Sequence, residues 1–267
     1  MFKVILQCSL LLVMPILGMI YLLQDALYAI LSTFGMEVSR IETMLKSLPL
    51  NERGLSIVSG LIISLIILWV FRKSNKDKVF NTGDNYGKYP YALYYIASKV
   101  LGYGFVTLVR VPIYLQFRLV IKDLFDNVKV DENTSEKAQP ITVVKKNMEL
   151  DSDEINLILI DTYPISEEQI PSAKRVLPTI DITNGTELNG IRTYNIQFID
   201  EIRKQTNELS HNYSKINVFA TTNTKHNKAI IESCFKNARR TGFKELTVFQ
   251  PGNTNNFFDE SYPILKK

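Results

Sequence analysis

Carboxylate, hydroxyl, amide and cationic side chains gather at two points where a short apolar run ends. Asp161 and Thr162 directly follow the run 155–160, and a second polar stretch follows the run 216–220. Such side chains can orient ligand hydroxyls, and lysines beside a helix N-terminus favour phosphate or another anion. The residues that we expect to contact such a ligand are Asp161, Thr162, Thr222, Asn223, Thr224, Lys225, His226 and Lys228.

The same residues also fit a plain polar turn between a strand and a helix. Asn223 or Thr224 can cap the following helix, and an Asp that ends a strand commonly caps the next turn. His226 could act as a general acid or base, although a histidine in a first helical turn is usually exposed to solvent. The chain has no glycine-rich phosphate loop and no Walker lysine motif, so capping is the simpler interpretation.

Other catalytic patterns are missing from the sequence. Cys8 lies in an apolar run, Cys234 lies on the apolar stripe of an expected helix, and His211 and His226 are the only histidines. We find no Ser-His-Asp arrangement, carboxylate pair or metal-ligand spacing. We therefore expect no catalytic residue, no metal and no cofactor, and a binding or assembly protein in preference to an enzyme.

Strands that alternate with helices must position the two polar stretches. The pattern predicts strands at 155–160, 179–183, 216–220 and 245–249. It predicts helices at 171–177, 193–209 and 224–240, the last ending at Gly242. This alternation favours a small Rossmann-like α/β domain with a mostly parallel sheet over residues 154–267. Ligands bind beyond the carboxyl ends of such strands, which is where both polar stretches would lie.

The N-terminal part of the chain has the composition of a membrane anchor. The runs 4–23 and 54–71 carry no charge and are about as long as the hydrocarbon core requires. Basic residues follow the second run, so the positive-inside rule predicts a two-helix transmembrane hairpin over residues 1–80 with both ends in the cytoplasm. A signal peptide is the competing interpretation of the first run. Small residues that would let the two helices approach closely are Gly54, Ser56, Ser59, Gly60 and Ser64.

Residues 81–126 are rich in tyrosine and harder to place. A third span over 90–109 would put Lys99 near the bilayer centre, which is costly. Beyond Pro112, Arg118, Lys122 and Asp126 recur every four residues among apolar side chains, which is typical of an amphipathic helix. We expect helices that lie on the cytoplasmic membrane interface. The alternatives are a third span, or helices that pack against the α/β domain; residues 127–153 read as a linker with a short strand at 141–144.

The arrangement as a whole suggests three functions. The net charge of +4 is too small to indicate nucleic-acid binding. We expect a multi-pass membrane protein whose cytoplasmic domain senses a small anionic, possibly nucleotide, ligand, acting as a homo-oligomer or in a membrane complex. Its architecture resembles that of bacterial defence effectors that couple two membrane helices to a nucleotide-sensing domain. The alternatives are a structural subunit of a secretion or DNA-transfer complex, and a membrane-tethered enzyme using Asp161 and His226.

Overall fold

The computed structural model contains two compact units, which are described separately. The first comprises Met1–Asn81 and Ala92–Phe105, and the second comprises Thr82–Tyr91 and Val106–Lys267. The structure describes residues 2–20, 23–81, 89–130, 135–185, 190, 192–236, 243–252 and 256–266.

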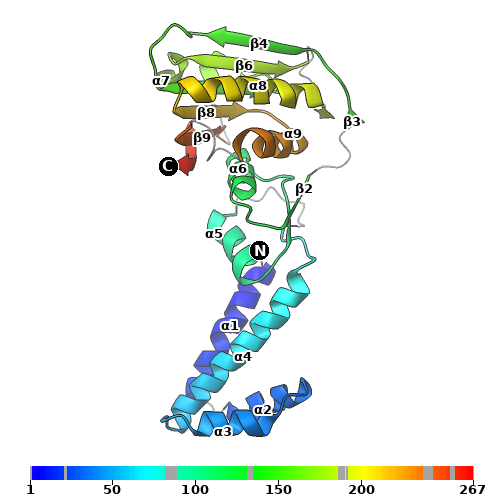
Figure 1. Cartoon of the computed structure of the whole chain (residues 1–267), viewed down its shortest axis with the longest axis vertical. Coiled ribbons are helices and arrows are strands. Elements are labelled where there is room, and N and C mark those ends of the chain that lie inside the picture. The colour runs from blue at the N-terminus through cyan, green and yellow to red at the C-terminus, as the bar shows by residue number, and fades with distance from the viewer. Residues whose placement is uncertain are drawn as a thin grey trace. The chain divides into compact units, whose positions relative to one another are not determined.

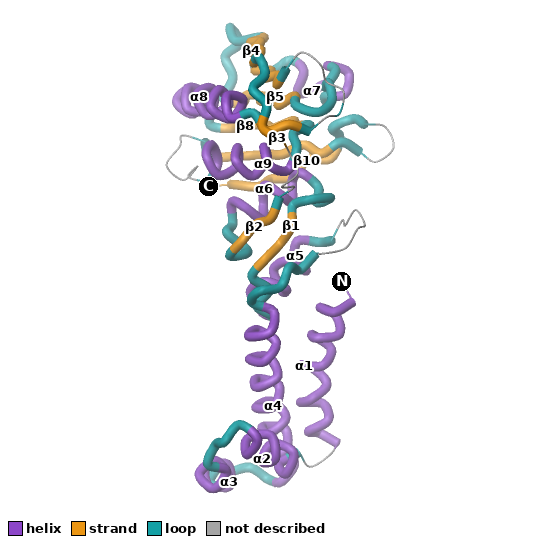
Figure 2. The backbone as a smooth tube through the Cα atoms, turned by 90° about the vertical axis from the view of Figure 1, so that its right-hand side faces the viewer, coloured by secondary structure: helices purple, strands orange, loops and turns teal. Residues whose placement is uncertain are grey.

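Two apolar helices form the first unit, α1 (Phe2–Ile20) and α4 (Glu52–Asn75), and they lie side by side (Figure 1 and Figure 2). They approach through residues with almost no side chain. A Cβ added at Gly18 would lie 2.7 Å from the carbonyl oxygen of Ser56, and one at Gly60 would lie 2.7 Å from that of Met14. The close approach that the small residues of the second run predict is therefore present.

Of the helices that the structure describes, α4 alone is long and apolar enough to cross a membrane, judged by length and composition. It has 24 residues, and the Asn51 side chain caps it by accepting the backbone N–H of Gly54 at 2.8 Å. The apolar stretch Phe2–Gly18 of α1 is shorter. The expected hairpin thus appears as two packed apolar helices, one of which is a candidate span; residues 21 and 22 of the expected first run lie outside the described residues.

Two short helices connect α1 to α4, namely α2 (Gln24–Thr33) and α3 (Val38–Lys46). Leu27, Leu31 and Leu45 from these helices are buried in one cluster with Ile63 of α4. The backbone N–H of Leu23 donates to the Ser56 hydroxyl at 2.8 Å, which fixes the start of α2 against α4. The connection between the two apolar helices is therefore packed on α4.

The segment considered as a third span is helical over a short stretch only. The helix α5 (Tyr91–Tyr95) continues into a π-helical turn, Ile96–Val100, so together they have ten residues. This is about half of what a bilayer crossing requires, which excludes a spanning helix here. The Arg72 guanidinium donates to the carbonyl oxygens of Lys99 and Val100 at 2.7 and 3.0 Å, satisfying the end of the turn.

A six-stranded mixed sheet organises the second unit, in the order β10-β9-β8-β5-β6-β4. The four inner strands are parallel to one another, whereas β4 and β10 pair antiparallel at the two edges. The α/β class is confirmed, and these pairings establish a mixed sheet without establishing a Rossmann-like one. The strands are β4 (Ile141–Lys146), β5 (Glu154–Ile160), β6 (Thr179–Asn184), β8 (Lys215–Ala220), β9 (Glu245–Gln250) and β10 (Glu260–Lys266).

Helices and minor strands complete this unit. The long helix α8 (Ile196–Asn212) packs against β4 and β6, as Figure 1 shows. The predicted helix at 224–240 begins at Thr224 and passes into a π-helical turn at Ile231–Phe235; its expected end at Gly242 lies outside the described residues. The remaining elements are α7 (Ser172–Arg175), α8 (Ile196–Asn212), α9 (Thr224–Ile230), the 3-10 turn Glu167–Gln169, and the strand pairs β1 (Phe105–Thr107) with β2 (Asn127–Lys129) and β3 (Ser135–Glu136) with β7 (Thr193–Tyr194).

One expectation for the middle of the chain does not hold. The helix α6 (Ile113–Ile121) packs against α9 and β9 within the second unit, and its Leu115 and Phe117 side chains are 1% and 0% exposed. These side chains cannot also face lipid, so packing against the α/β domain replaces the expected interfacial helix. The expected strand at 141–144 is present as β4 and runs on to Lys146, so six residues of the expected linker pair with β6.

Candidate functional site

The order of the strands brings the carboxyl ends of β5 and β8 together at a topological switch point. The chain passes from β5 to its neighbour β6 on one side, and from β8 to β9 on the other. Asp161 and Thr162 follow β5, while Thr221 and Thr222 follow β8. The backbone N–H of Thr162 donates to the carbonyl oxygen of Thr221 at 3.2 Å. Such a position is where open α/β sheets bind ligands.

Asp161 is the centre of a buried polar network at this point. Its side chain is 2% exposed. The oxygen Oδ2 accepts the backbone N–H of Asn223 at 3.0 Å and its side-chain amide at 2.9 Å. The oxygen Oδ1 accepts the Asn184 amide at 2.7 Å. A buried carboxylate requires such donors, because removal from water is otherwise strongly unfavourable.

His226 is the third residue that contacts this carboxylate, and its hydrogen bonds define its tautomer. Its Nε2 accepts the backbone N–H of Asn195 at 2.8 Å, so this nitrogen carries a lone pair. We therefore assign the ring proton to Nδ1, which lies 2.8 Å from Oδ2 of Asp161. The residue is 0% exposed, contrary to the exposed position expected from the sequence. Both nitrogens are occupied by protein groups, so neither reaches a substrate in this arrangement.

The capping interpretation of the second polar stretch is correct. The Asn223 side-chain oxygen accepts the backbone N–H of His226 at 2.9 Å at the start of α9. Asn227, one residue further on, is also buried and donates to the Gln116 side-chain oxygen of α6 at 3.0 Å. Thr222 donates its hydroxyl to the Asn227 side chain. These contacts tie α6 to the same edge of the sheet.

Three side chains at this edge are less buried than the network. Tyr194 stacks on the His226 ring with 5.3 Å between ring centres. The Lys225 ammonium lies 4.5 Å from the centre of the Tyr194 ring. Tyr163 is 61% exposed, and its hydroxyl would be 2.9 Å from a Cβ at Gly190. We call Tyr163, Tyr194 and Lys225 the rim; burial, followed by the nearby charges of Glu136 and Asp200, raises the pKa of Tyr194.

The structure places the eight expected ligand residues in three settings. Thr224 and Lys225 are half-buried at the start of α9, beside the network. Lys228 lines a cavity of about 110 Å³ together with Asp123 and Glu232, which are not part of the network. No group of three potential metal ligands occurs among the described residues. The residues inside or touching the buried network are Asp161, Thr162, Thr222, Asn223 and His226.

Four amides that are not among the expected ligand residues complete the network. Asn195 donates to the side-chain oxygen of Asn184 at 2.7 Å, and Gln116 and Asn227 link α6 to α9. A signal existed for two of them, because Asn184 ends the predicted strand at 179–183 and Asn195 lies near the start of a predicted helix. No local pattern distinguishes Gln116 or Asn227 from exposed amides.

Two solved receptor structures are similar to this chain at low sequence identity. One similar solved structure is the Acinetobacter baumannii Cap4 SAVED/CARF-domain receptor with the cyclic trinucleotide 3'3'3'-cAAA, at 11% identity and a TM-score of 0.44. That match covers 90% of this chain and 64% of the receptor. The Moraxella osloensis Cap4 receptor matches at 11% identity and a TM-score of 0.40, over 96% of this chain and 76% of the receptor.

The family comparison covers nearly the whole chain, although no curated protein matches it. Residues 1–265 match the model described as the SMODS- and Ubiquitin system-associated 2TM effector domain, SUa-2TM. This match extends from the first apolar helix to the last strand of the sheet. The chain therefore belongs to the family of SMODS- and ubiquitin-system-associated 2TM effector domains.

Proposed function

We propose that this chain is a membrane-anchored effector whose α/β domain binds a small anionic, nucleotide-like ligand at the carboxyl edge of its inner strands. Membership of a 2TM effector family supports the effector role, and the apolar helix α4 supports the anchor. The observation that carries the ligand site is the Lys225–Tyr194 pair, which rests on a buried polar network at the switch point.

The rim has the chemistry that a nucleotide requires. A nucleobase is a flat aromatic group that stacks on aromatic side chains, and its phosphate is an anion that pairs with lysine. Tyr163 and Tyr194 provide aromatic rings, and Lys225 provides the cation. The hydrogen-bonded network beneath them holds their backbone in place before binding, which lowers the entropic cost of association.

The start of α9 contributes less to anion binding than the sequence suggests. The backbone N–H groups of Asn223 and His226 already donate to Asp161 and to the Asn223 side chain. A phosphate would therefore depend on Lys225 more than on these amides. The network itself supports a binding role over catalysis, because Asp161 and His226 are buried and paired with each other.

The basic residues after the apolar part of α4 support an assignment of the side of the membrane on which the α/β domain lies. Arg72, Lys73 and Lys76 follow the apolar part of α4, and basic residues concentrate on the cytoplasmic side of spanning helices. We therefore assign the α/β domain to the cytoplasm, with α1 as the second membrane helix. Ligand binding there would alter the state of the membrane region, in a homo-oligomer or a larger complex.

Thermal unfolding of the full chain in detergent tests the ligand site. The panel should contain cyclic di- and trinucleotides, including those present in the Cap4 receptor structures. A true ligand at 100 times its Kd stabilises the folded state by about 2.7 kcal/mol, which raises the midpoint by several degrees. Lys225→Ala should remove this gain. The matched control is Lys215→Ala, at the amino end of β8, which should keep it.

Two results would count against the proposal. One is that no nucleotide of the panel raises the midpoint of the unaltered chain. The other is that Lys215→Ala and Lys225→Ala reduce the gain equally, since the carboxyl edge would then have no special role.

A further inference from the structure

One face of α4 changes from apolar to basic along a single stripe. Ile62, Leu65, Ile66 and Trp69 are spaced three, four and seven residues apart, so they lie on the same side of the helix. Lys73 continues the stripe one turn beyond Trp69. Its ammonium lies 5.3 Å from the centre of the Trp69 ring. The stripe therefore carries a positive charge at one end.

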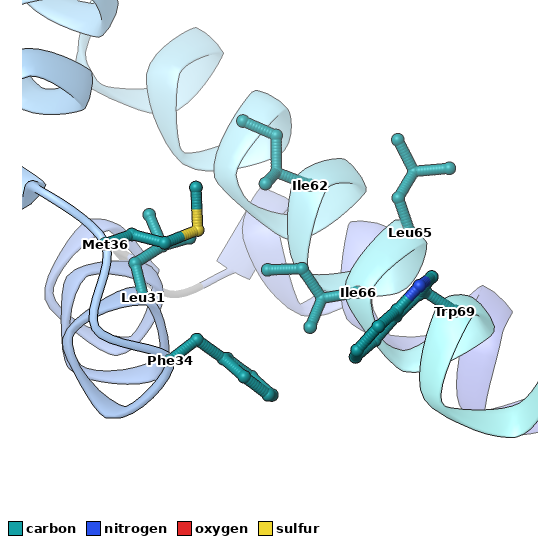
Figure 3. A pocket seen from close by; sticks show the side chains of 7 residues that line it. All are labelled: Leu31, Phe34, Met36, Ile62, Leu65, Ile66 and Trp69. Atoms are coloured by element: carbon teal, nitrogen blue, oxygen red, sulfur yellow. The ribbon is translucent and has the colours of Figure 1, made fainter. Parts of the chain in front are cut away.

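This stripe forms one wall of an apolar groove of about 470 Å³ (Figure 3). Leu31 of α2 with Phe34 and Met36 of the following turn form the opposite wall. The Phe34 and Trp69 rings meet edge to face, with 6.2 Å between their centres. All seven lining residues are apolar, and the volume lies within the range of about 300–1,000 Å³ that small-molecule sites occupy.

The groove leaves large apolar side chains uncovered. Leu65 is 65% exposed, Trp69 is 54% exposed and Phe34 is 50% exposed. Contiguous apolar surface of this kind marks a binding site for protein or lipid. Because it lies on the one described helix that is long and apolar enough to span, its surroundings are hydrocarbon if the proposed membrane anchor is correct.

We propose that this groove binds one acyl chain of an anionic phospholipid, with the lipid phosphate beside Lys73. This inference rests on the membrane anchor of the proposed function. A phospholipid has an apolar chain and one charged end. The stripe matches this order, because its apolar side chains are followed along the helix by the Trp69 indole and then by the Lys73 cation. Tryptophan and basic side chains concentrate at the headgroup level of membranes, which is the level that this assignment gives to Trp69 and Lys73.

A second copy of the chain fits the groove less well. If two copies met through this face in parallel, each Lys73 would approach the other, and like charges repel. A parallel arrangement is the one that two copies inserted in the same direction must adopt. The charge at the end of the stripe therefore favours an anionic lipid over self-association.

Trp69 makes the test direct, because it is the single tryptophan of the chain. The full chain is reconstituted in phosphatidylcholine vesicles that contain a small fraction of phospholipid with brominated acyl chains, which quench nearby indoles. The brominated lipid is either phosphatidylglycerol or phosphatidylcholine. We expect brominated phosphatidylglycerol to be enriched next to Trp69 roughly fivefold over brominated phosphatidylcholine. This factor corresponds to about 1 kcal/mol, the contribution of one cation at an anionic surface.

Three variants separate the parts of the proposal. Lys73→Gln should bring the selectivity close to one, whereas Arg53→Gln, at the other end of α4, should leave it unchanged. Ile66→Phe fills the groove and keeps Lys73, so it should also remove the selectivity. The ratio of quenching by the two brominated lipids is compared within each variant, because loss of the cation changes the Trp69 emission itself.

The outcomes distinguish this inference from the function on which it rests. Equal quenching by both lipids, or selectivity that survives Lys73→Gln and Ile66→Phe, would overturn the lipid site. Weak quenching by either lipid would mean that protein covers the groove, and would overturn it as well. Extraction of the chain from vesicles by alkaline carbonate would overturn the membrane anchor, whereas failure of the nucleotide panel would leave the lipid site standing.

Discussion

The contact between α1 and α4 and the carboxyl edge of the sheet are both tightly packed, and they achieve this with opposite kinds of residue. At the helix contact, Gly18 and Gly60 remove side chains so that backbone meets backbone. At the sheet edge, the space is filled by side chains that hydrogen-bond one another, centred on Asp161 and His226. The first contact depends on shape, and the second depends on each polar group having a partner.

The difference suits the surroundings that the proposed membrane anchor would give α1 and α4. Hydrocarbon gives no hydrophobic drive to helix association, so close approach through small residues would provide the contact energy there. In the sheet, a buried polar network adds specificity, but each partner that is lost leaves an unpaired group. Substitutions should therefore act differently at the two regions: added bulk should disrupt the helix contact, and removed polar atoms should disrupt the edge.

The largest effect should follow the loss of the central carboxylate. Asp161→Ala leaves the amides of Asn184 and Asn223 and the His226 ring without their acceptor, so the free energy of unfolding should fall by about 3–5 kcal/mol. Urea denaturation followed by far-UV circular dichroism in detergent measures this. The exposed Asp151→Ala should change it by less than about 0.5 kcal/mol. Equal effects of the two would mean that the network does not stabilise the fold.

A loss of similar size is expected for α6 if it belongs to the α/β unit. Phe117 is fully buried and its ring lies 5.7 Å from that of Phe235. Phe117→Ala should lower the free energy of unfolding by about 3–5 kcal/mol, whereas Val176→Ala, at a 63% exposed position, should have little effect. If Phe117→Ala changes vesicle binding but not stability, α6 is an interfacial helix after all.

A smaller effect is expected at the helix contact. Gly60→Leu places a side chain where even a Cβ would lie 2.7 Å from the Met14 carbonyl oxygen, so α1 and α4 must separate. The expected cost is about 1–3 kcal/mol, measured from Trp69 fluorescence during unfolding in mixed micelles of rising SDS content. Leu61→Ala changes a 49% exposed residue of the same helix and serves as control. A Gly60→Leu variant as stable as this control would show that the two helices do not depend on close approach.

The smallest effect should be the loss of the stability that Glu154 contributes when the pH falls into the acidic range. Burial raises the pKa of Glu154, but hydrogen bonds from Lys174 and Asn217 outweigh it and hold the pKa below its usual value. Stability from this group is therefore complete above the unfolded pKa of about 4.3 and is lost as the pH falls through the lower folded pKa. Glu154→Gln should cost less than about 1 kcal/mol at pH 7.

The corresponding measurement is the unfolding midpoint of the unaltered chain and of Glu154→Gln between pH 3 and pH 7. The difference between them should shrink below about pH 4. A difference that stays constant, or grows toward acid, would contradict the direction of the shift. Asp126→Asn, at an exposed position, controls for general charge effects.

The inner strands were predictable because they are short apolar runs with clear ends. The runs 155–160 and 216–220 end directly before Asp161 and Thr221, and β5 and β8 end at the same points. The edge strands were harder, because one of their faces meets solvent. The strand expected at 141–144 stops short of Lys145 and Lys146, with which β4 ends, and no strand is expected in the tail, where β10 contains Pro263. The chain was therefore predicted better at the centre of the sheet than at its edges.

The partner of α6 and the interior of the site could not be predicted from local pattern. An amphipathic helix with aromatic residues has the same sequence whether its apolar side meets a membrane or a protein, so α6 was assigned to the membrane surface. Asp161 and His226 were both singled out, but their pairing spans 65 residues and depends on how β5 and β8 align. Helix capping by Asn223 was predictable because it is a local interaction.

The antiparallel strands at the two ends of the sheet have a consequence for aggregation. An exposed edge strand is a template on which another chain can add. Here β10 contains Pro263, which has no N–H to offer, and its register shifts between Pro263 and Leu265. The other edge, β4, carries the exposed Lys145 and Lys146, whose charges repel a second copy of the same strand. Growth of a continuous sheet from copy to copy is therefore disfavoured at both ends.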